Sequence, residues 1–351
     1  ELSYFKMNKT MNKRLFYTLL LIVLVLFSSC KHKLTKEDAL TKGMPSSGGK
    51  TLEMLLIIPD SLYNKTMRDF VGNIFEKAQE GLPQKEPYFD LVQLTPAQYY
   101  NSEMFKKHRN VLIIEKKAGN NNTIKQAINK GVYPQAIFEI KVDNIDSIYS
   151  ILNSYAETIK YQYRKNEHIR IYNAFKRDEN IKLTEVISNK FNFSLTFSSD
   201  YYLAKQTDNF LWIRKETQKE SFNIMMYKKK YTSDDLLLEK KVIELRDSLG
   251  KAFIPASMPN SYMGTEIREN ISKLYRDTVK VGDYAMIETR GLWRSFGDFM
   301  GGAFVNYCFK NPATNELVMI DCFLYNPNKN KRDYLMQLES IVYSIEKTKK
   351  K

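Results

Sequence analysis

The stretch ELVMIDCFLY, residues 316–325, decides the fold of the second half of this chain. It is almost wholly apolar and of strand length, which indicates a strand that is covered on both faces. The sequence RDYLMQLESIVYSIEK (332–347) follows it after a short polar connection. Apolar residues recur there at helical spacing, at Leu335, Leu338, Ile341, Val342 and Ile345. We therefore expect the chain to close with a buried strand and an amphipathic helix that packs on the sheet.

Working backwards from this ending, the second half is dominated by strand patterns. We expect strands at 193–198, 201–206, 209–216, 221–228, 282–291 and 303–310, in addition to 316–325. Helical spacing is found at 181–190, at 238–249 and, in a loop-rich stretch, at 262–274. Mostly antiparallel strands with a few covering helices indicate an α+β sheet domain, which we place at residues 181–347.

The first half alternates strands and helices. Strands are expected at 51–59, 88–94, 110–115 and 136–142, and helices at 62–80, 96–105 and 122–130. A long helix is expected from 145 to 175, where apolar residues step at three or four positions. The alternation predicts an α/β-like first domain, residues 51–180, that ends in this long helix. The overall fold class is therefore α+β.

The N-terminal residues have the features of a secretory signal. Lys13 and Arg14 precede a low-polarity stretch at 15–27, and the small residues Ser28 and Ser29 follow it. That stretch is shorter than the roughly 20 apolar residues of a spanning helix, and it fits the apolar core of a signal peptide, which has about 7 to 15 residues. We treat 1–29 as upstream residues and signal peptide, with Met7 and Met11 as alternative starts.

Cys30 follows these small residues directly and resembles the modified cysteine of a bacterial lipoprotein signal. The resemblance implies that the thiol of Cys30 is acylated and that the chain is cut before it. A plain secretory signal with a chance Cys, or an uncleaved anchor, stays open as an alternative. Residues 30–50 are then the lipidated Cys and a polar tether, and residues 348–351 are a basic tail.

The charge of the chain is strongly positive. Cleavage before Cys30 would remove four of 54 basic and one of 40 acidic residues, which leaves a formal net charge of +11. That charge suits an anionic lipid surface or an anionic envelope polymer, although it is spread along the chain. We expect no nucleic-acid partner, because the sequence contains no recognition motif.

The residue types that carry chemistry are sparse. The three histidines are not at metal-ligand spacing, and neither H-E-x-x-H nor G-x-S-x-G occurs. We expect no catalytic residue, no metal and no cofactor, while a pair of acids that only the fold brings together stays open. Cys308 and Cys322 flank the turn of a predicted hairpin, and they are either two buried thiols or, in a shifted register, a disulfide.

The stretch RGLWRSFGDFMGG (290–302) is the one candidate for a ligand-binding loop. It combines glycines with Trp293 and two arginines between predicted strands. Backbone N–H groups and guanidinium groups could bind an anion, with the indole as a stacking surface. The candidate residues are Arg290, Trp293, Arg294, Gly297, Gly301 and Gly302. A plain strand connection with covering aromatic residues is the alternative.

Taken whole, the mature chain resembles an uncharacterised family of lipoproteins from Bacteroidota. The residues that carry the resemblance are SSCKHK, TLEMLLIIPD, GLWRSFGDFMGG and the ending from MIDCFLY onward. It implies a host with an outer membrane and a lipoprotein on the periplasmic face of that membrane. The final strand and helix are also similar to the end of small antiparallel-sheet domains of the PsbP type, a likeness of fold that implies no function.

These features favour a non-enzymatic envelope lipoprotein that binds an envelope protein partner or an anionic envelope polymer. One alternative is an envelope hydrolase that acts on glycan or peptide, with acids at the domain junction or near Trp293. Another is a carrier of lipid or another small ligand, which requires an apolar cavity.

Overall fold

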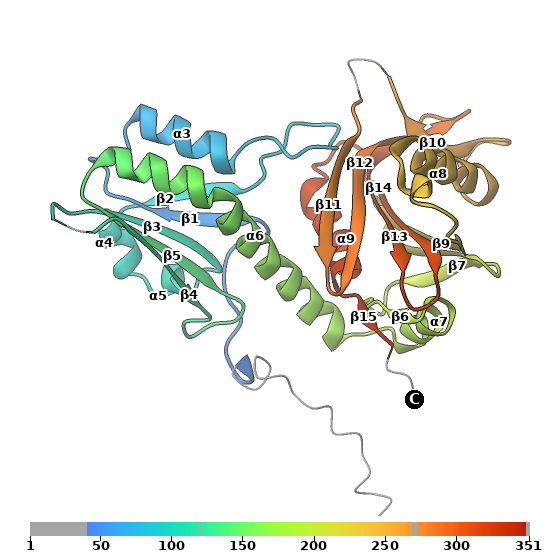
Figure 1. The fold of residues 1–351 in the computed structure, drawn as a ribbon, viewed down its shortest axis with the longest axis horizontal. Coiled ribbons are helices and arrows are strands. Elements are labelled where there is room, and N and C mark those ends of the chain that lie inside the picture. The colour runs from blue at the N-terminus through green and yellow to red at the C-terminus, as the bar shows by residue number, and fades with distance from the viewer. Residues whose placement is uncertain (1–40, 120, 269–271, 349–351) are drawn as a thin grey trace, which may run out of the picture. The chain divides into compact units, whose positions relative to one another are not determined.

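A five-stranded sheet forms the first half of the chain in the computed structural model (Figure 1). Its strand order is β2-β1-β3-β5-β4, and β4 alone pairs antiparallel. The strands are β1 (Glu53–Ile57), β2 (Asp90–Leu94), β3 (Asn110–Lys116), β4 (Thr123–Ile128) and β5 (Ala136–Val142). The helix predicted at 122–130 was wrong. This segment is strand β4, because pairing with β5 at the sheet edge outweighs its weak helical pattern.

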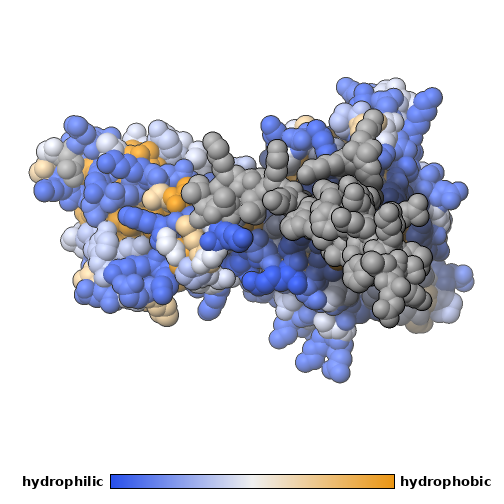
Figure 2. Space-filling model, turned by 90° about the horizontal axis from the view of Figure 1, so that it is seen from below, coloured by the Kyte–Doolittle hydropathy of each residue, from blue (hydrophilic) through white to orange (hydrophobic). Residues whose placement is uncertain are grey.

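Helices cover the two faces of this sheet unequally. On one face lie α3 (Lys65–Phe75) and α6 (Ile145–Arg177), which pack on alternate strand residues such as Leu56 and Leu112. The other face carries only the short helices α4 (Pro96–Tyr100) and α5 (Glu103–Lys106) over a smaller apolar cluster. Figure 2 views the molecule from the side of α4 and α5, and hydrophobic residues appear there among hydrophilic ones.

The second sheet is antiparallel and follows the order β10-β12-β13-β14-β9-β8-β7, with β11 also paired to β12. The strands are β7 (Tyr202–Gln206), β8 (Phe210–Glu216), β9 (Ser221–Lys230), β10 (Tyr262–Glu266), β11 (Tyr275–Val281), β12 (Tyr284–Phe296), β13 (Gly301–Asn311) and β14 (Glu316–Tyr325). The helix predicted at 262–274 was wrong. Residues 262–266 form β10, which completes its backbone hydrogen bonds against β12.

Strand β14 has two buried faces, as its sequence predicted. Ile320, Cys322 and Leu324 belong to one apolar cluster, and Met319 and Phe323 belong to another. Helix α9 (Arg332–Tyr343) packs on the first face, and α8 (Glu239–Phe253), which follows the short 3-10 helix Asp234–Leu237, lies over the second. Helix α7 (Ile181–Phe191) and the two-residue strands β6 (Phe193–Ser194) and β15 (Glu346–Lys347) complete the α+β fold.

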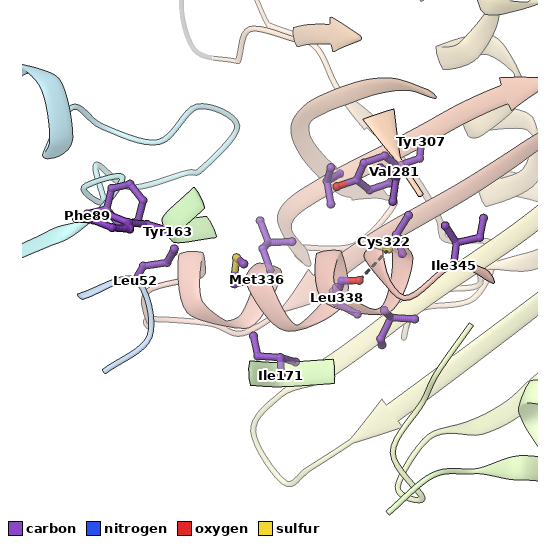
Figure 3. Close-up of a cluster of buried hydrophobic side chains, with 14 of the residues drawn as sticks. Leu52, Phe89, Tyr163, Ile171, Val281, Tyr307, Cys322, Met336, Leu338 and Ile345 are labelled. Atoms are coloured by element: carbon purple, nitrogen blue, oxygen red, sulfur yellow. Dashed lines mark hydrogen bonds between the residues drawn. The ribbon is translucent and has the colours of Figure 1, made fainter. Parts of the chain in front are cut away.

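Helix α6 connects the two sheets through a shared core. It is 33 residues long; its first half packs on the five-stranded sheet, and its second half packs along α9. The largest apolar cluster runs through both halves of the chain, from Leu52 and Phe89 to Leu338 and Ile345 (Figure 3). Tyr163 and Ile171 of α6 lie within it.

The structure describes residues 41–119, 121–268 and 272–348, of which those from Pro45 onward belong to one compact unit. Cys30 and the signal peptide lie outside the described residues. No described helix is long and apolar enough to cross a membrane. We expected the tether to extend to residue 50, but backbone hydrogen bonds join residues 45–48 to the connections that precede β3 and β5. Gly48 donates its N–H to the Lys107 carbonyl at 2.8 Å, and Pro45 accepts a bond from Tyr133 N–H at 2.9 Å.

Candidate functional site

The stretch 290–302 is not the loop that we expected. It forms the end of β12, a four-residue turn at 297–300 and the start of β13. Trp293 pairs with Gly302, and Arg294 pairs with Gly301, across the hairpin. The backbone N–H groups of these residues are therefore used within the sheet, so they are not free to form an anion-binding loop.

The structure does not bring the six candidate residues together. Arg290 lies on the α9 face of β12, where Glu288 and Glu339 bind its guanidinium group. Trp293 points to the opposite face, is buried, and donates its indole N–H to the Leu324 carbonyl at 3.1 Å. Its ring is thus no stacking surface for a ligand. Arg294 is exposed.

Local backbone geometry and packing explain why this stretch contains glycines. Gly297 has a φ of +82° in the turn, which a side chain rarely adopts. A Cβ atom on Gly302 would overlap the Leu324 carbonyl and approach the Trp293 indole nitrogen to 2.9 Å. A Cβ atom on Gly301 would lie 3.0 Å from the Trp293 carbonyl oxygen. Gly301 and Gly302 thus allow the close strand packing around Trp293.

The most concentrated charges lie instead at the junction of α6, α9 and β12. Glu339 of α9 is 1% exposed. One of its carboxylate oxygens lies 2.8 Å from Arg290 Nη1, and the other forms an ion pair with Arg164 of α6. Arg290 also binds Glu288 at 2.6 Å. Four charged side chains from three elements therefore neutralise one another inside the protein.

Electrostatics fixes the protonation states at this junction. Burial alone would raise the pKa of Glu339, but Arg290 and Arg164 outweigh it and lower the pKa to about 2. Burial, assisted by Arg164, lowers the pKa of His168 to about 3. The His168 ring stacks on Tyr343 at 3.8 Å between centroids, and its Nδ1 atom is hydrogen-bonded to Ser340 at 3.0 Å. At neutral pH the carboxylate is ionised and the imidazole is neutral.

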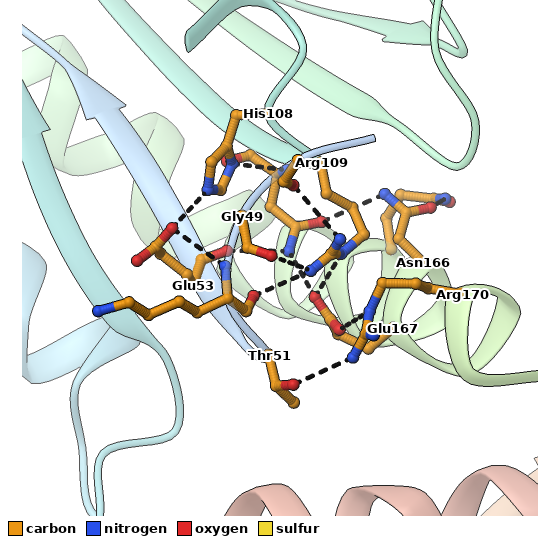
Figure 4. A network of polar contacts seen from close by, with 12 residues as sticks. Gly49, Thr51, Glu53, His108, Arg109, Asn166, Glu167 and Arg170 are labelled. Atoms are coloured by element: carbon orange, nitrogen blue, oxygen red, sulfur yellow. Dashed lines mark hydrogen bonds and ion pairs between the residues drawn. The ribbon is translucent and has the colours of Figure 1, made fainter. Parts of the chain in front are cut away.

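A second buried network fixes the start of the compact unit to α6 (Figure 4). Arg109 is the last residue before β3, and it binds Glu167 of α6 at 2.6 Å. Its guanidinium group also donates to the carbonyls of Gly48, Gly49 and Lys50. The side chains of Arg109 and Glu167 have no exposed surface. The Arg109 guanidinium group thus fixes the backbone of residues 48–50, while Glu167 balances its charge.

The edge of this network contains the only described histidine that contacts a carboxylate. His108 Nε2 lies 2.9 Å from Glu53 Oε1, and the ring is buried. Burial lowers the pKa of His108, although Glu53 opposes that shift. A Cβ atom on Gly49 would overlap the His108 ring, so the backbone of residue 49 covers the imidazole.

A third buried pair lies under α8. Arg246 binds Asp321 of β14 at 2.8 Å and Thr265 of β10 at 2.9 Å, and Asn306 donates to the same Asp321 oxygen. The guanidinium carbon of Arg246 lies 3.8 Å from the centre of the Phe304 ring. Arg246 and Asp321 have no exposed side-chain surface. This pair connects α8 to the centre of the sheet.

The described residues offer little reactive chemistry. They contain no group of three or more His, Cys, Asp or Glu residues placed to hold a metal ion. Cys308 and Cys322 are free buried thiols, so the disulfide alternative was wrong. They lie on opposite faces of the sheet, in different apolar clusters. Burial raises the pKa of both thiols, which keeps them protonated and poorly nucleophilic.

The chain matches two domains of unknown function. Residues 180–344 match the family model described as Domain of unknown function (DUF4837), and residues 47–176 match Domain of unknown function (DUF8532). No curated protein matches the chain. Among solved structures, similarity is found to the Ran-binding protein Mog1p of Saccharomyces cerevisiae and to a mutant of the protein Mog1. Each shows 9% identity and a TM-score of 0.29 over 45% of this chain, and over 90% and 91% of the other chain.

Sequence reasoning missed the buried charges, although α6 carries a signal for them. Glu167 occupies the same helical stripe as Tyr163 and Ile171, at spacings of four residues. A charged residue inside an apolar stripe must be paired if it is buried. Its partner Arg109 lies in another element, and no local pattern identifies it.

Proposed function

We propose that this protein is an envelope lipoprotein. Acylated Cys30 holds it on the outer membrane, facing the periplasm, and its folded body acts as a non-enzymatic binding or assembly module. The observation that carries the second part is the closed junction, where Glu288 and Glu339 are bound by arginines. The binding partner is an envelope protein or an anionic envelope polymer.

The closed junction disfavours the hydrolase alternative. A glycosidase acid must hold a proton near neutral pH and must reach the substrate. The pKa of Glu339 is lowered to about 2, and its side chain is almost fully buried. Arg290 fills the space between Glu288 and Glu339. These two acids are therefore suited to holding α9 against β12 and α6, and poorly suited to catalysis.

The anchor is supported by sequence alone and has a direct test. The variant Cys30→Ala, expressed in the natural host, should move from the membrane fraction to the soluble envelope fraction. Mass spectrometry of the wild-type N-terminal peptide should show Cys30 as the first residue with two or three acyl chains. A variant that stays in the membrane fraction, or an unmodified Cys30 still joined to residues 11–29, would contradict the anchor.

The binding role needs a separate measurement. The tagged protein would be purified from detergent-solubilised membranes and compared with Glu339→Gln, which should loosen the junction. A stoichiometric partner that is retained by the wild type supports an assembly role. Turnover of envelope glycans or peptides by the purified protein would instead support the hydrolase alternative and contradict the proposal.

A further inference from the structure

One end of the antiparallel sheet presents apolar side chains to solvent. Two connections meet there, namely the β12–β13 turn at 297–300 and the α8–β10 connection at 254–261. Phe299 is fully exposed, at 106% of its reference area, and Met258 is 56% exposed. Ser257 joins the two connections by donating its N–H to Asp298 Oδ2 at 2.9 Å. We call Phe299 and Met258 the apolar tip.

The backbone of the apolar tip is held in place. Asp298 Oδ1 accepts the Phe299 N–H at 2.7 Å, and the Met300 carbonyl accepts the Ser295 N–H at 2.8 Å. Gly297 supplies the positive φ of +82° that the turn requires. Phe299 is therefore held outward by an ordered turn. A partner that buries Phe299 therefore need not order the backbone of this turn, which lowers the entropy cost of binding.

Two aromatic residues flank the connections that form the tip, and each has a cation over its ring. Tyr262 of β10 and Phe296 of β12 stack at 5.4 Å between centroids. The Arg294 guanidinium lies 4.3 Å from the Phe296 ring centre, and Lys251 Nζ lies 5.4 Å from that of Tyr262. Gly264 makes room for this arrangement, because a Cβ atom there would come within 2.6 Å of the Phe296 ring.

Two nearby carboxylates, Asp298 and Glu266, offset part of this positive charge. Asp298 is turned back onto the Ser257 and Phe299 N–H groups, and these backbone hydrogen bonds lower its pKa. Glu266 is buried and forms ion pairs with Arg268 at 2.7 Å and with Arg294 at 3.5 Å. Arg294 keeps 46% of its side chain exposed. Because two arginines share the one Glu266 carboxylate and Lys251 is exposed, positive charge remains beside the apolar tip. We define Arg294 and Lys251 as the basic collar.

We propose that the apolar tip is a contact site for an anionic lipid surface. Phe299 and Met258 would enter the interface between headgroups and acyl chains, while Arg294 and Lys251 would bind lipid phosphates. A protruding tip with basic side chains around it matches the two contributions to interfacial binding, which are apolar burial and attraction to anionic lipid. The idea extends the proposed function, because a chain held at a membrane by Cys30 meets that surface at high effective concentration.

The test uses residues 31–351 without acylation, which include the whole compact unit. Binding is measured by co-sedimentation with vesicles of phosphatidylethanolamine and phosphatidylglycerol (7:3), and with phosphatidylcholine vesicles as the neutral comparison. We expect binding to the anionic vesicles that weakens about tenfold in Phe299→Ala and further in Phe299→Glu. Tyr161→Ala and Tyr161→Glu are the matched controls, because Tyr161 on α6 is 65% exposed, and they should bind like the wild type.

A second readout locates the contact. Cys308 and Cys322 are fully buried, so an environment-sensitive dye on Met258→Cys labels the tip selectively. Its emission should shift to the blue with anionic vesicles and be quenched by brominated acyl chains. No binding to anionic vesicles, or equal binding by Phe299→Glu and wild type, would overturn the proposal. Because the protein tested carries no acyl chain, either result is independent of whether Cys30 is lipidated.

Discussion

Replacing Glu339 with Gln should remove the charge that holds the junction of α6, α9 and β12 together. The substitution keeps the shape of the side chain but leaves Arg290 and Arg164 facing a neutral amide. Both guanidinium groups would remain largely buried without their shared counter-charge. Breaking a buried ion pair by removing one partner is strongly destabilising for this reason.

The size of the effect follows from the pKa of Glu339. Its pKa falls from 4.5 to about 2 on folding. At about 1.4 kcal/mol per pKa unit, the ionised carboxylate contributes about 3 kcal/mol to the free energy of unfolding. Loss of one partner of a buried ion pair costs about 3 to 5 kcal/mol in other proteins, and the value from the pKa agrees with the lower end of that range. Because the pKa is lowered by folding, this contribution is complete above pH 4.5 and is lost as the pH falls through about 2.

Urea unfolding at pH 7 would measure this effect with two probes. Trp212 and Trp293 both lie in the antiparallel sheet, so their fluorescence follows that sheet, while circular dichroism follows both halves. The control is Glu244→Gln, whose carboxylate forms a solvent-exposed pair with Lys241 and should therefore contribute little to stability. A loss of less than about 1 kcal/mol in Glu339→Gln, or a loss that is unchanged near pH 2, would refute the reasoning.

Three further predictions concern other buried contacts. The pKa of His168 is lowered to about 3, so the free energy of unfolding of the wild type should fall as the pH decreases below 6.5. In His168→Gln the dependence of that free energy on pH between pH 6 and 4 should be smaller by about 1.4 kcal/mol per pH unit. Urea unfolding at several pH values would measure it. Glu86 accepts the backbone N–H groups of Lys331 and Arg332 at the start of α9, so Glu86→Ala should lower the free energy of unfolding by about 1 kcal/mol, measured by thermal denaturation. Gly302→Ala should cost about 2 kcal/mol in urea unfolding, because its Cβ atom would overlap a neighbouring strand; an unaffected variant would contradict that packing.

Much of the fold could be predicted because its elements have strong local patterns. The apolar strand at 316–325 and the amphipathic helix after it are β14 and α9. The strand at 136–142 and the long helix from 145 have the predicted beginnings, since apolar spacing is unbroken in both. These elements bury a continuous apolar stripe or face, which the sequence displays directly.

The errors occurred where tertiary contacts outweigh local pattern. Strand β4 has only partly buried or exposed residues, and its apolar residues fit a helix as well as a strand. Strand β10 contains a glycine, and its conformation depends on β12, nearly thirty residues further along the chain. The stretch 290–302 contains features typical of a binding loop, but Gly301 and Gly302 serve close packing around Trp293. Local sequence cannot distinguish a glycine that admits a ligand from one that admits a neighbouring strand.

The matches to two family models and the contacts between the matched segments lead to one physical conclusion. The models meet at the end of α6, between residues 176 and 180. Yet Glu86 of the first segment accepts the backbone N–H groups at the start of α9, which belongs to the second segment. In addition, Ile171 and Phe175 of α6 share a core with the second sheet. Each segment therefore completes surfaces that the other would leave exposed. A partner that binds either sheet acts on a body whose two halves are coupled through α6, Glu339 and Arg164.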